Sequence, residues 1–428
     1  MRIHLAYGRK GLEVDLPDRH LVKVLDYQAM APLADPAGAV ADCLRRPVGT
    51  PPLVEMARGK RTACIVVCDI TRPVPNALVL PPLLDALHSG GIAAADISIL
   101  IATGLHRPNW DSELEEVLGP DIPRHYAVYN HDGRNLAEHR FLGHSPRGIP
   151  IWIDARFVEA DLKIAVGLIE PHFMAGFSGG RKLVCPGIAA RETILAWHSP
   201  ALLESPLARA GSLDGNPVHE ENTWIARRAG LDFVVNTVID QHRRLLHVSA
   251  GEMDAAFASA VDVARQAAVD RLAAPVDVVV TSAAGYPLDA TYYQTIKGMV
   301  AVEPIIRPGG TIIIAAEISE GVGGPEFAAL FDEHPDLDSF LRWMHSSGEV
   351  RTDQWQLEMF ARAAKKARIT LVTDGLSPAQ VRRMYVNHCA SVESAVAEAI
   401  ERYGPTATLA AVPKGPYVLP EIAPASPR

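Results

Sequence analysis

ACIVVC (63–68), LVLPPLLDALHSGG (78–91) and ISILIA (97–102) are the three consecutive segments that decide the fold. The first and third are short apolar runs, which are typical of parallel strands buried on both faces of a sheet. The middle segment predicts a helix, and Gly90 and Gly91 end it because glycine adopts the left-handed conformation at little cost. A strand, a helix and a strand within about 40 residues predict a βαβ unit and therefore an α/β fold.

Segments of the same two kinds continue on both sides of this unit. Strands are expected in a hairpin (2–5 and 12–16) and at 126–129, 149–153 and 162–169, and helices at 191–197, 218–229 and 253–268. The composition changes near 273–275, where VDVVVTSAAG (276–285) opens a second block. In this block we expect helices at 290–302, 354–367 and 392–403, and strands at 311–316, 369–373 and 406–412. The sequence therefore predicts two α/β domains with mainly parallel sheets, residues 1–272 and 273–428, with the active site in the cleft between them.

The composition sets limits on the class of protein. Of the 428 residues 48% are hydrophobic and 21% are charged, which is close to the globular average and excludes intrinsic disorder. A net charge of −9 argues against nucleic-acid binding, although it permits a local basic pocket for a small anion. The first residues alternate polar and apolar, unlike a secretory signal, and no run approaches the roughly 18 apolar residues of a membrane span. We therefore expect a cytoplasmic protein whose five scattered cysteines are reduced.

Polar side chains follow the carboxyl ends of four predicted strands, in the segments 69–73, 102–108, 170–173 and 284–287. In open parallel sheets the ligand crevice lies outside these ends, so we expect one site assembled from several of them. His106 and His172 are the best acid–base candidates, because imidazole titrates near neutral pH and two of them can exchange the roles of base and acid. Any single histidine among the 16 of the chain is more often a surface residue, and the paired position is what favours a functional role.

The segment GFSGGRK (176–182) is a glycine-rich loop that leads into Arg181 and Lys182. Backbone N–H groups with cations beside them can hold a phosphate. The spacing is neither that of a Walker loop nor the G-x-G-x-x-G of dinucleotide folds, and a tight turn with solvated charges fits the residues equally well. These residues by themselves indicate no more than a phosphate-bearing ligand and a lysine open to covalent modification.

Four further positions, two of them taken as a pair, have two interpretations each. His198 ends a predicted helix, where a cation favoured by the helix dipole is the simpler interpretation. The sequence has no H-E-x-x-H motif and no pair of C-x-x-C motifs, so a zinc site made only of protein ligands is not predicted. Gln294 and Lys297 share one helical face and either point into a cleft together or face solvent. Trp355, at a helix start after Asp353, packs over a small ligand or, as is commoner, fixes the helix start.

In this order the segments resemble the nickel-dependent lactate racemase family. The resemblance rests on CDITRPVP (68–75), ATGLHRP (102–108), EPHFMAGFSGGRK (170–182), AWHS (196–199), GYPLD (285–289), YQTIKGM (293–299) and DQW (353–355). It implies that the cofactor is a nickel-pincer nucleotide, the nickel-bound pyridinium-3,5-bisthiocarboxylic acid mononucleotide. Lys182 would carry this cofactor through a thioamide, and His198 would bind the nickel.

The resemblance also implies roles for the remaining residues. His106 and His172 would be the two catalytic bases. The nucleotide would be held by Asp69, Thr71, Arg72, Gln294 and Lys297, and the substrate by Arg72, Tyr293, Lys297 and Trp355. Three positions depart from the family pattern: Ile70 replaces a histidine, Met174 a phenylalanine and Leu183 a serine. Met174 is expected near the pocket, so the substrate stays open among lactate, malate, other short 2-hydroxy acids and sugar acids.

The predicted activity is inversion of C2 of a 2-hydroxy acid by reversible hydride transfer. Removing a proton from C2 would create a carbanion beside a carboxylate, whereas removing hydride gives a stable 2-keto acid. A nicotinamide-dependent dehydrogenase is an alternative that would need a dinucleotide fingerprint, and none is present. A non-catalytic nucleotide-cofactor carrier is a second alternative, but it would need no paired bases. The expected partners are the small substrate and the enzymes that make the cofactor.

Overall fold

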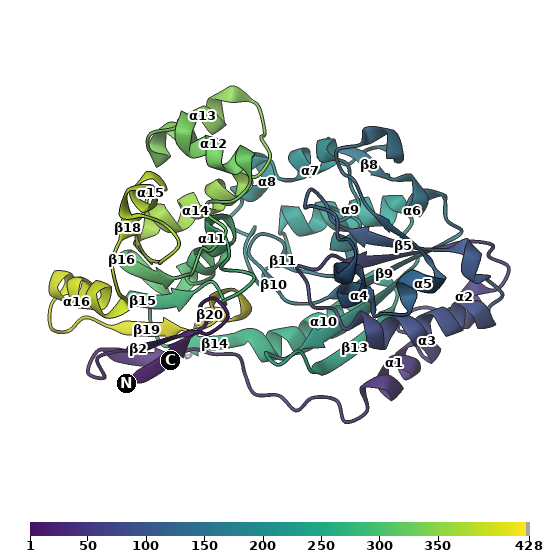
Figure 1. The fold of residues 1–428 in the computed structure, drawn as a ribbon, viewed down its shortest axis with the longest axis horizontal. Coiled ribbons are helices and arrows are strands. Elements are labelled where there is room, and N and C mark those ends of the chain that lie inside the picture. Colours follow the sequence, from purple (N-terminus) through teal and green to yellow (C-terminus); the bar gives the residue numbers. More distant parts are fainter. Residues whose placement is uncertain (425–428) are drawn as a thin grey trace.

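The predicted βαβ unit lies at the centre of a six-stranded sheet in the computed structural model, which describes residues 1–424 (Figure 1). The strand order is β13-β12-β9-β4-β5-β6, and all neighbours are parallel except β12 and β13. The strands are β4 (Ala63–Cys68), β5 (Ile97–Ala102), β6 (Ala127–Asn130), β9 (Leu162–Leu168), β12 (Phe233–Ile239) and β13 (Leu245–Gly251).

Alternate residues of β4 pack against opposite helical layers. Ile65 and Val67 belong to a core with α1 (Pro36–Arg45), α2 (Leu53–Ala57) and α3 (Asn76–Ser89). Cys64 and Val66 belong to a core that includes Trp197 of α7 (Arg191–Trp197) and Ile225 of α9 (Pro217–Ala229). Both faces of the sheet are therefore covered, which explains why the strand has no polar alternation.

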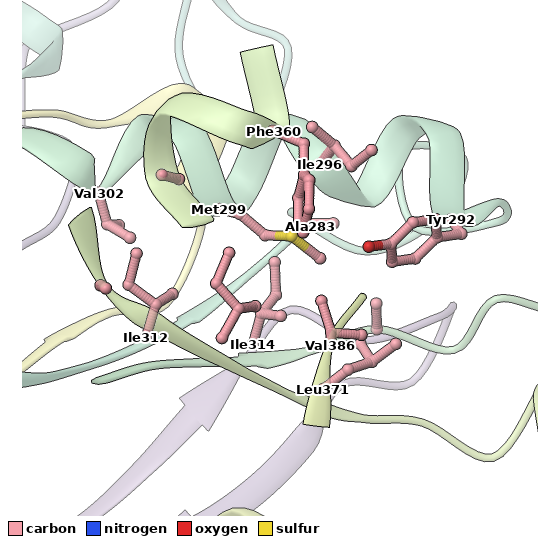
Figure 2. Close-up of a cluster of buried hydrophobic side chains, with 14 of the residues drawn as sticks. Ala283, Tyr292, Ile296, Met299, Val302, Ile312, Ile314, Phe360, Leu371 and Val386 are labelled. Carbon is pink, nitrogen blue, oxygen red and sulfur yellow. The ribbon is translucent and has the colours of Figure 1, made fainter. Parts of the chain in front are cut away.

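The second sheet has the order β18-β17-β16-β15-β19-β3, and all its pairs are parallel. Its strands are β3 (Leu21–Val24), β15 (Val276–Ser282), β16 (Ile306–Ala315), β17 (Arg368–Val372), β18 (Asn387–His388) and β19 (Leu409–Val412). Figure 2 shows the core on one face, where Ile296 and Met299 of α11 (Tyr292–Ala301) and Phe360 of α14 (Gln354–Lys366) pack over Ile312 and Ile314. This packing fixes α11 and α14, the two helices that carry site residues.

The amino-terminal segment departs from the predicted division at residue 272, which placed it in the first domain. Strands β1 (Arg2–Leu5) and β2 (Leu12–Asp15) form the expected hairpin, but its apolar residues pack in a core with β15, β16 and α16 (Val392–Tyr403). Strand β3 pairs with β19 at the edge of the second sheet (Figure 1). The hairpin pattern predicts the pairing of β1 with β2, but it holds no information about which sheet will cover its apolar face.

The remaining elements are helices and strands that lie outside the two six-stranded sheets. They are α4 (Ser112–Leu118), α5 (Ile122–His125), β7 (His139–His144), β8 (Pro150–Asp154), α6 (Ala155–Glu159), β10 (Pro171–His172), β11 (Gly176–Phe177), α8 (Pro200–Leu203), α10 (Met253–Ala268), β14 (Val269–Leu272), α12 (Pro325–Glu333), α13 (Leu337–Ser347), α15 (Pro378–Arg383) and β20 (Leu419–Ile422). Strands β14 and β20 pair in parallel outside the two large sheets. Within residues 1–424, no helix combines the length and the apolar character needed to cross a bilayer.

Candidate active site

A cavity of about 510 Å³ lies between the two sheets and receives residues from both. It is lined by all eleven residues that the sequence singled out for the site: Asp69, Thr71, Arg72, His106, His172, Lys182, His198, Tyr293, Gln294, Lys297 and Trp355. The loops after β4, β5 and β9 contribute as expected, and α11 and α14 contribute from the second domain. The fourth expected loop, 284–287, does not line this cavity; its Tyr286 is exposed and stacks with Arg9.

Asp69 holds His106 in one orientation. The Asp69 carboxylate is buried, and its Oδ2 lies 2.7 Å from His106 Nδ1 while its Oδ1 accepts from the Thr71 hydroxyl at 2.6 Å. Burial opposes the charged carboxylate, but His106 and the Thr71 hydroxyl favour it more strongly, so the pKa of Asp69 is lowered. A carboxylate at Nδ1 keeps the proton of the neutral ring there and leaves Nε2 to exchange protons.

Two cations face the cavity from different domains. Arg72 Nε pairs with Glu170 at 2.9 Å, and its backbone follows β4. Lys297 of α11 has no hydrogen bond or ion pair among residues 1–424, and burial, with Arg72 next in effect, lowers its pKa to about 7. Gln294, one helical turn earlier, has a buried Oε1 atom without a partner. The interpretation of this helix face as solvated is therefore wrong. Lys297 can pair with an anionic group of a ligand, and Gln294 Oε1 can accept from a hydrogen-bond donor of that ligand.

The glycine-rich loop places Lys182 beside His172. Lys182 Nζ lies 3.0 Å from His172 Nε2 and 5.1 Å from the centroid of the Trp197 ring. Burial lowers the pKa of both groups, that of Lys182 to about 7. Arg181 points elsewhere, with its guanidinium 2.9 Å from Asp254 and over the ring of Phe257. The two adjacent cations of the sequence are thus on opposite sides of the loop.

The loop reaches this position because all three of its glycines have a positive φ, which glycine adopts at little cost; Gly176 has a φ of 78°. Gly179 has a φ of 75° and Gly180 a φ of 50°. A Cβ atom on Gly179 would lie 2.8 Å from the carbonyl oxygen of Leu168, at the end of β9. The backbone amide of Gly180 donates to Asn236 Oδ1 at 3.0 Å, so it is occupied within the protein.

His198 and Trp355 form one of the contacts between the domains, and both line the cavity. Their rings stack with centroids 4.1 Å apart and an angle of 19°. His198 is buried, and its Nδ1 donates to the carbonyl of Ile194 at 2.8 Å, which leaves the Nε2 lone pair available as a ligand. Burial lowers its pKa to about 3, so the ring is neutral and the interpretation as a helix-end cation is wrong. Trp355 Nε1 donates to the Tyr293 hydroxyl at 3.0 Å, so its contacts extend beyond the start of its own helix.

Several lining residues were found only in part, or not at all, from the sequence. Glu320, Gly323 and Gly324, from a glycine-rich segment of the second domain, also line the cavity, and Met174 lies in the wall as expected. Arg134 was missed, although it follows β6 and the same strand-end rule would have found it. Asp353 has a φ of 68°, unusual for a residue with a side chain, and burial raises the pKa of its carboxyl.

Family models and relatives agree along nearly the whole chain. Residues 7–211 match the lactate racemase N-terminal domain and residues 271–419 the lactate racemase C-terminal domain. The lactate racemase of Thermoanaerobacterium thermosaccharolyticum is 37% identical over 388 residues, covering 90% of this chain and 91% of that protein. The lactate racemase of Lactiplantibacillus plantarum is 35% identical over 418 residues, covering 96% and 98%.

The solved structures give the same result at the level of the fold. The lactate racemase apoprotein from T. thermosaccharolyticum superposes with a TM-score of 0.93 at 35% identity, covering 98% of this chain and 100% of that one. A protein from Thermotoga maritima, 20% identical, shares the fold with a TM-score of 0.69, covering 93% and 100%. With paired histidines in a cavity between two matched domains, this chain belongs to the lactate racemase family and is an isomerase.

Proposed function

We propose that this protein racemises lactate or a closely related 2-hydroxy acid, with His106 and His172 as its two bases. The observation that carries the proposal is that both histidines line one cavity on loops from different strands, with separate partners. Inverting C2 requires proton exchange with the 2-hydroxyl in either of two orientations. Two independently held histidines suit that task, because one base cannot reach both orientations without moving.

The anionic end of the substrate would be held by Arg72 and Lys297. Arg72 Nε is paired with Glu170 and its Nη1 donates to the Thr71 carbonyl at 3.1 Å, which leaves Nη2 for a carboxylate or phosphate. Lys297 has no protein partner among residues 1–424, and a bound carboxylate would favour its charged form. Because one cation comes from each domain, an anion between them also joins the domains.

The residues present fit the nickel-pincer nucleotide. Residues 1–424 hold no group of three or more His, Cys, Asp or Glu side chains arranged for a metal, so His198 would supply one nitrogen to a metal whose other donors come from the ligand. Sulfur and imidazole donors suit nickel in this role. Lys182, whose Nζ lies 3.0 Å from His172, would carry the covalent attachment, and the Gln294 oxygen, unpartnered among residues 1–424, would accept from a ribose hydroxyl. When bound, the cofactor supplies a hydride acceptor, and the protein supplies the positioning and the proton transfers.

Met174 is the residue most relevant to substrate choice. It is buried in the cavity wall, two positions after His172. A thioether side chain is flexible and fills irregular space, so the wall beside His172 adapts to more than one short side chain on C3. Lactate is the first substrate to test, because both similar enzymes are lactate racemases.

The proposal is tested by co-expressing the chain with the enzymes that make the cofactor. We expect an intact mass increased by an adduct on Lys182, bound nickel, and conversion of either pure enantiomer of lactate to an equal mixture. A panel of single-enantiomer 2-hydroxy acids, measured by loss of optical rotation, identifies the preferred substrate. Reduction of added NAD⁺ by lactate without racemisation would favour the dehydrogenase and refute the proposal.

A further inference from the structure

The hydrogen bonds of His172 determine which ring nitrogen carries the proton. Its Nδ1 receives the backbone N–H groups of Met174 at 3.4 Å and Ala175 at 3.2 Å. These groups only donate, so Nδ1 is an acceptor and has no proton. The neutral ring therefore carries its proton on Nε2.

The partner of that proton is the lysine amine. Lys182 Nζ lies 3.0 Å from Nε2, and no other hydrogen bond or ion pair of Nζ occurs among residues 1–424. An ammonium group has no lone pair and cannot accept, whereas a neutral amine can. The geometry therefore requires that Lys182 be neutral in this state.

The surroundings of Lys182 favour the same state. The charged or titratable groups that face it are His172, Arg72, Lys297, His198, Cys185 and Glu170. Two of these groups are cations, and Glu170 is paired with Arg72. Burial and the nearby cations lower the pKa of Lys182 to about 7, in agreement with the hydrogen-bond count.

We infer that His172 is a positioning residue for Lys182: its Nε2–H donates to Nζ and holds the lysine as a neutral, oriented amine. In this state Lys182 can react with a carboxyl or thiocarboxyl group of the ligand and become acylated by it. This inference rests on the proposed attachment at Lys182 and gives His172 a role before any turnover. A C–N bond forms between Nζ and the thiocarboxyl carbon, and the C–O bond of that group breaks. The oxygen leaves as water, which takes one proton from Nζ and one from the thiocarboxylic acid. Nothing is oxidised or reduced. The product nitrogen has lost its accepting lone pair, so attachment ends the hydrogen bond that His172 donates to Lys182.

The experiment measures the nucleophilicity of Lys182 in the full chain made without the cofactor-synthesis enzymes. The protein is treated at pH 7 with limiting acetic anhydride, which acetylates amines and releases acetate, and peptide masses give the ratio of labelling at Lys182 to that at exposed Lys60. An ordinary lysine with a pKa of about 10.4 is neutral in roughly one molecule in 2,500 at this pH, so we expect Lys182 to label at least about tenfold faster. His172→Phe keeps an aromatic ring but removes the donor, and it should reduce the ratio by about tenfold or more. His106→Phe alters the same cavity without touching Lys182 and should leave the ratio unchanged.

A second measurement does not depend on any variant. Nitrogen-15 NMR of histidine-labelled protein reports the tautomer of His172, and the proton is expected on Nε2. A proton on Nδ1, an unchanged ratio in His172→Phe, or Lys182 labelling no faster than Lys60 would each overturn the inference. If Lys182 labels much faster than Lys60 but the co-expressed protein carries no adduct, the proposed attachment is wrong and the role of His172 is not affected. If the adduct forms but Lys182 labels no faster than Lys60, the role of His172 is wrong and the attachment is not affected.

Discussion

Replacing Glu358 by glutamine should stabilise the protein at alkaline pH and leave it unchanged at acid pH. Glu358 lies in α14, one turn after Trp355; it is 4% exposed, and neither carboxyl oxygen has a hydrogen-bond partner among the described residues. Burial, with Glu204 next in effect, raises its pKa from 4.5 to about 8. The folded state therefore favours the protonated acid, and this contribution is complete below the unfolded pKa and lost as pH rises through about 8.

The size of the effect follows from the two pKa values. A difference of 8 − 4.5 = 3.5 units corresponds to about 5 kcal/mol at most, because each unit is worth about 1.36 kcal/mol. Glu358→Gln keeps the shape and removes the charge, so its advantage over the natural protein should grow between pH 5 and pH 9 toward a few kcal/mol. The assay is urea unfolding across this pH range, and Glu116→Gln on exposed α4 is the matched control with no such trend. Parallel pH profiles for Glu358→Gln and the natural protein would refute the reasoning.

Three further predictions concern the site. His106→Ala and His172→Ala should each reduce racemisation by about 10²–10⁴-fold and, in single turnovers of pure enantiomers, impair oxidation of opposite hands; impairment of the same hand in both would contradict the two-sided arrangement. Lys297→Met should weaken binding of substrate or nucleotide by about tenfold or more, because it removes one of two cations, and unchanged affinities for both would exclude that role. Gly179→Ala should lower the free energy of unfolding in urea by about 1–3 kcal/mol, because its Cβ would clash with the end of β9. Gly309→Ala is the control: it has the same φ of 75° but open space around it, and it should lower this free energy by less. Equal losses in the two variants would mean that the clash at β9 is relieved.

Three helices were predicted to the residue, and three others, expected at 218–229, 290–302 and 354–367, differ from α9, α11 and α14 by one or two residues at one or both ends. The expected helices 191–197, 253–268 and 392–403 coincide with α7, α10 and α16. Strand β12 was missed although it is buried along most of its length, because its apolar run FVVNTVI is interrupted by Asn236 and Thr237. Asn236 is polar for a reason the sequence does not show: its side chain accepts from the glycine-rich loop.

The motifs and strand ends predicted residues that line one cavity, but they did not predict the hydrogen-bond partners of those residues. A strand end predicts that Asp69 and His106 approach one another, whereas their 2.7 Å contact depends on the paths of two loops. Arg181 and Lys182 are adjacent in sequence and equally basic, and only the packing of Phe257 and Asp254 against the loop sends one of them away from the cavity. Such choices are made by tertiary contacts, which a local pattern does not encode.

The division of the site between two domains links ligand binding to the arrangement of those domains. Trp355 and Met359 of α14 pack into the apolar core of the first domain, and Trp355 stacks on His198 there. Lys297 of α11 faces the same cavity as Arg72, and both side chains would be brought together by one anion. Any ligand that contacts both cations binds this arrangement and not a separated one, so its binding free energy also stabilises the contact between Trp355 and His198. Binding of the anion should therefore also strengthen the stacking of Trp355 on His198, the proposed metal ligand.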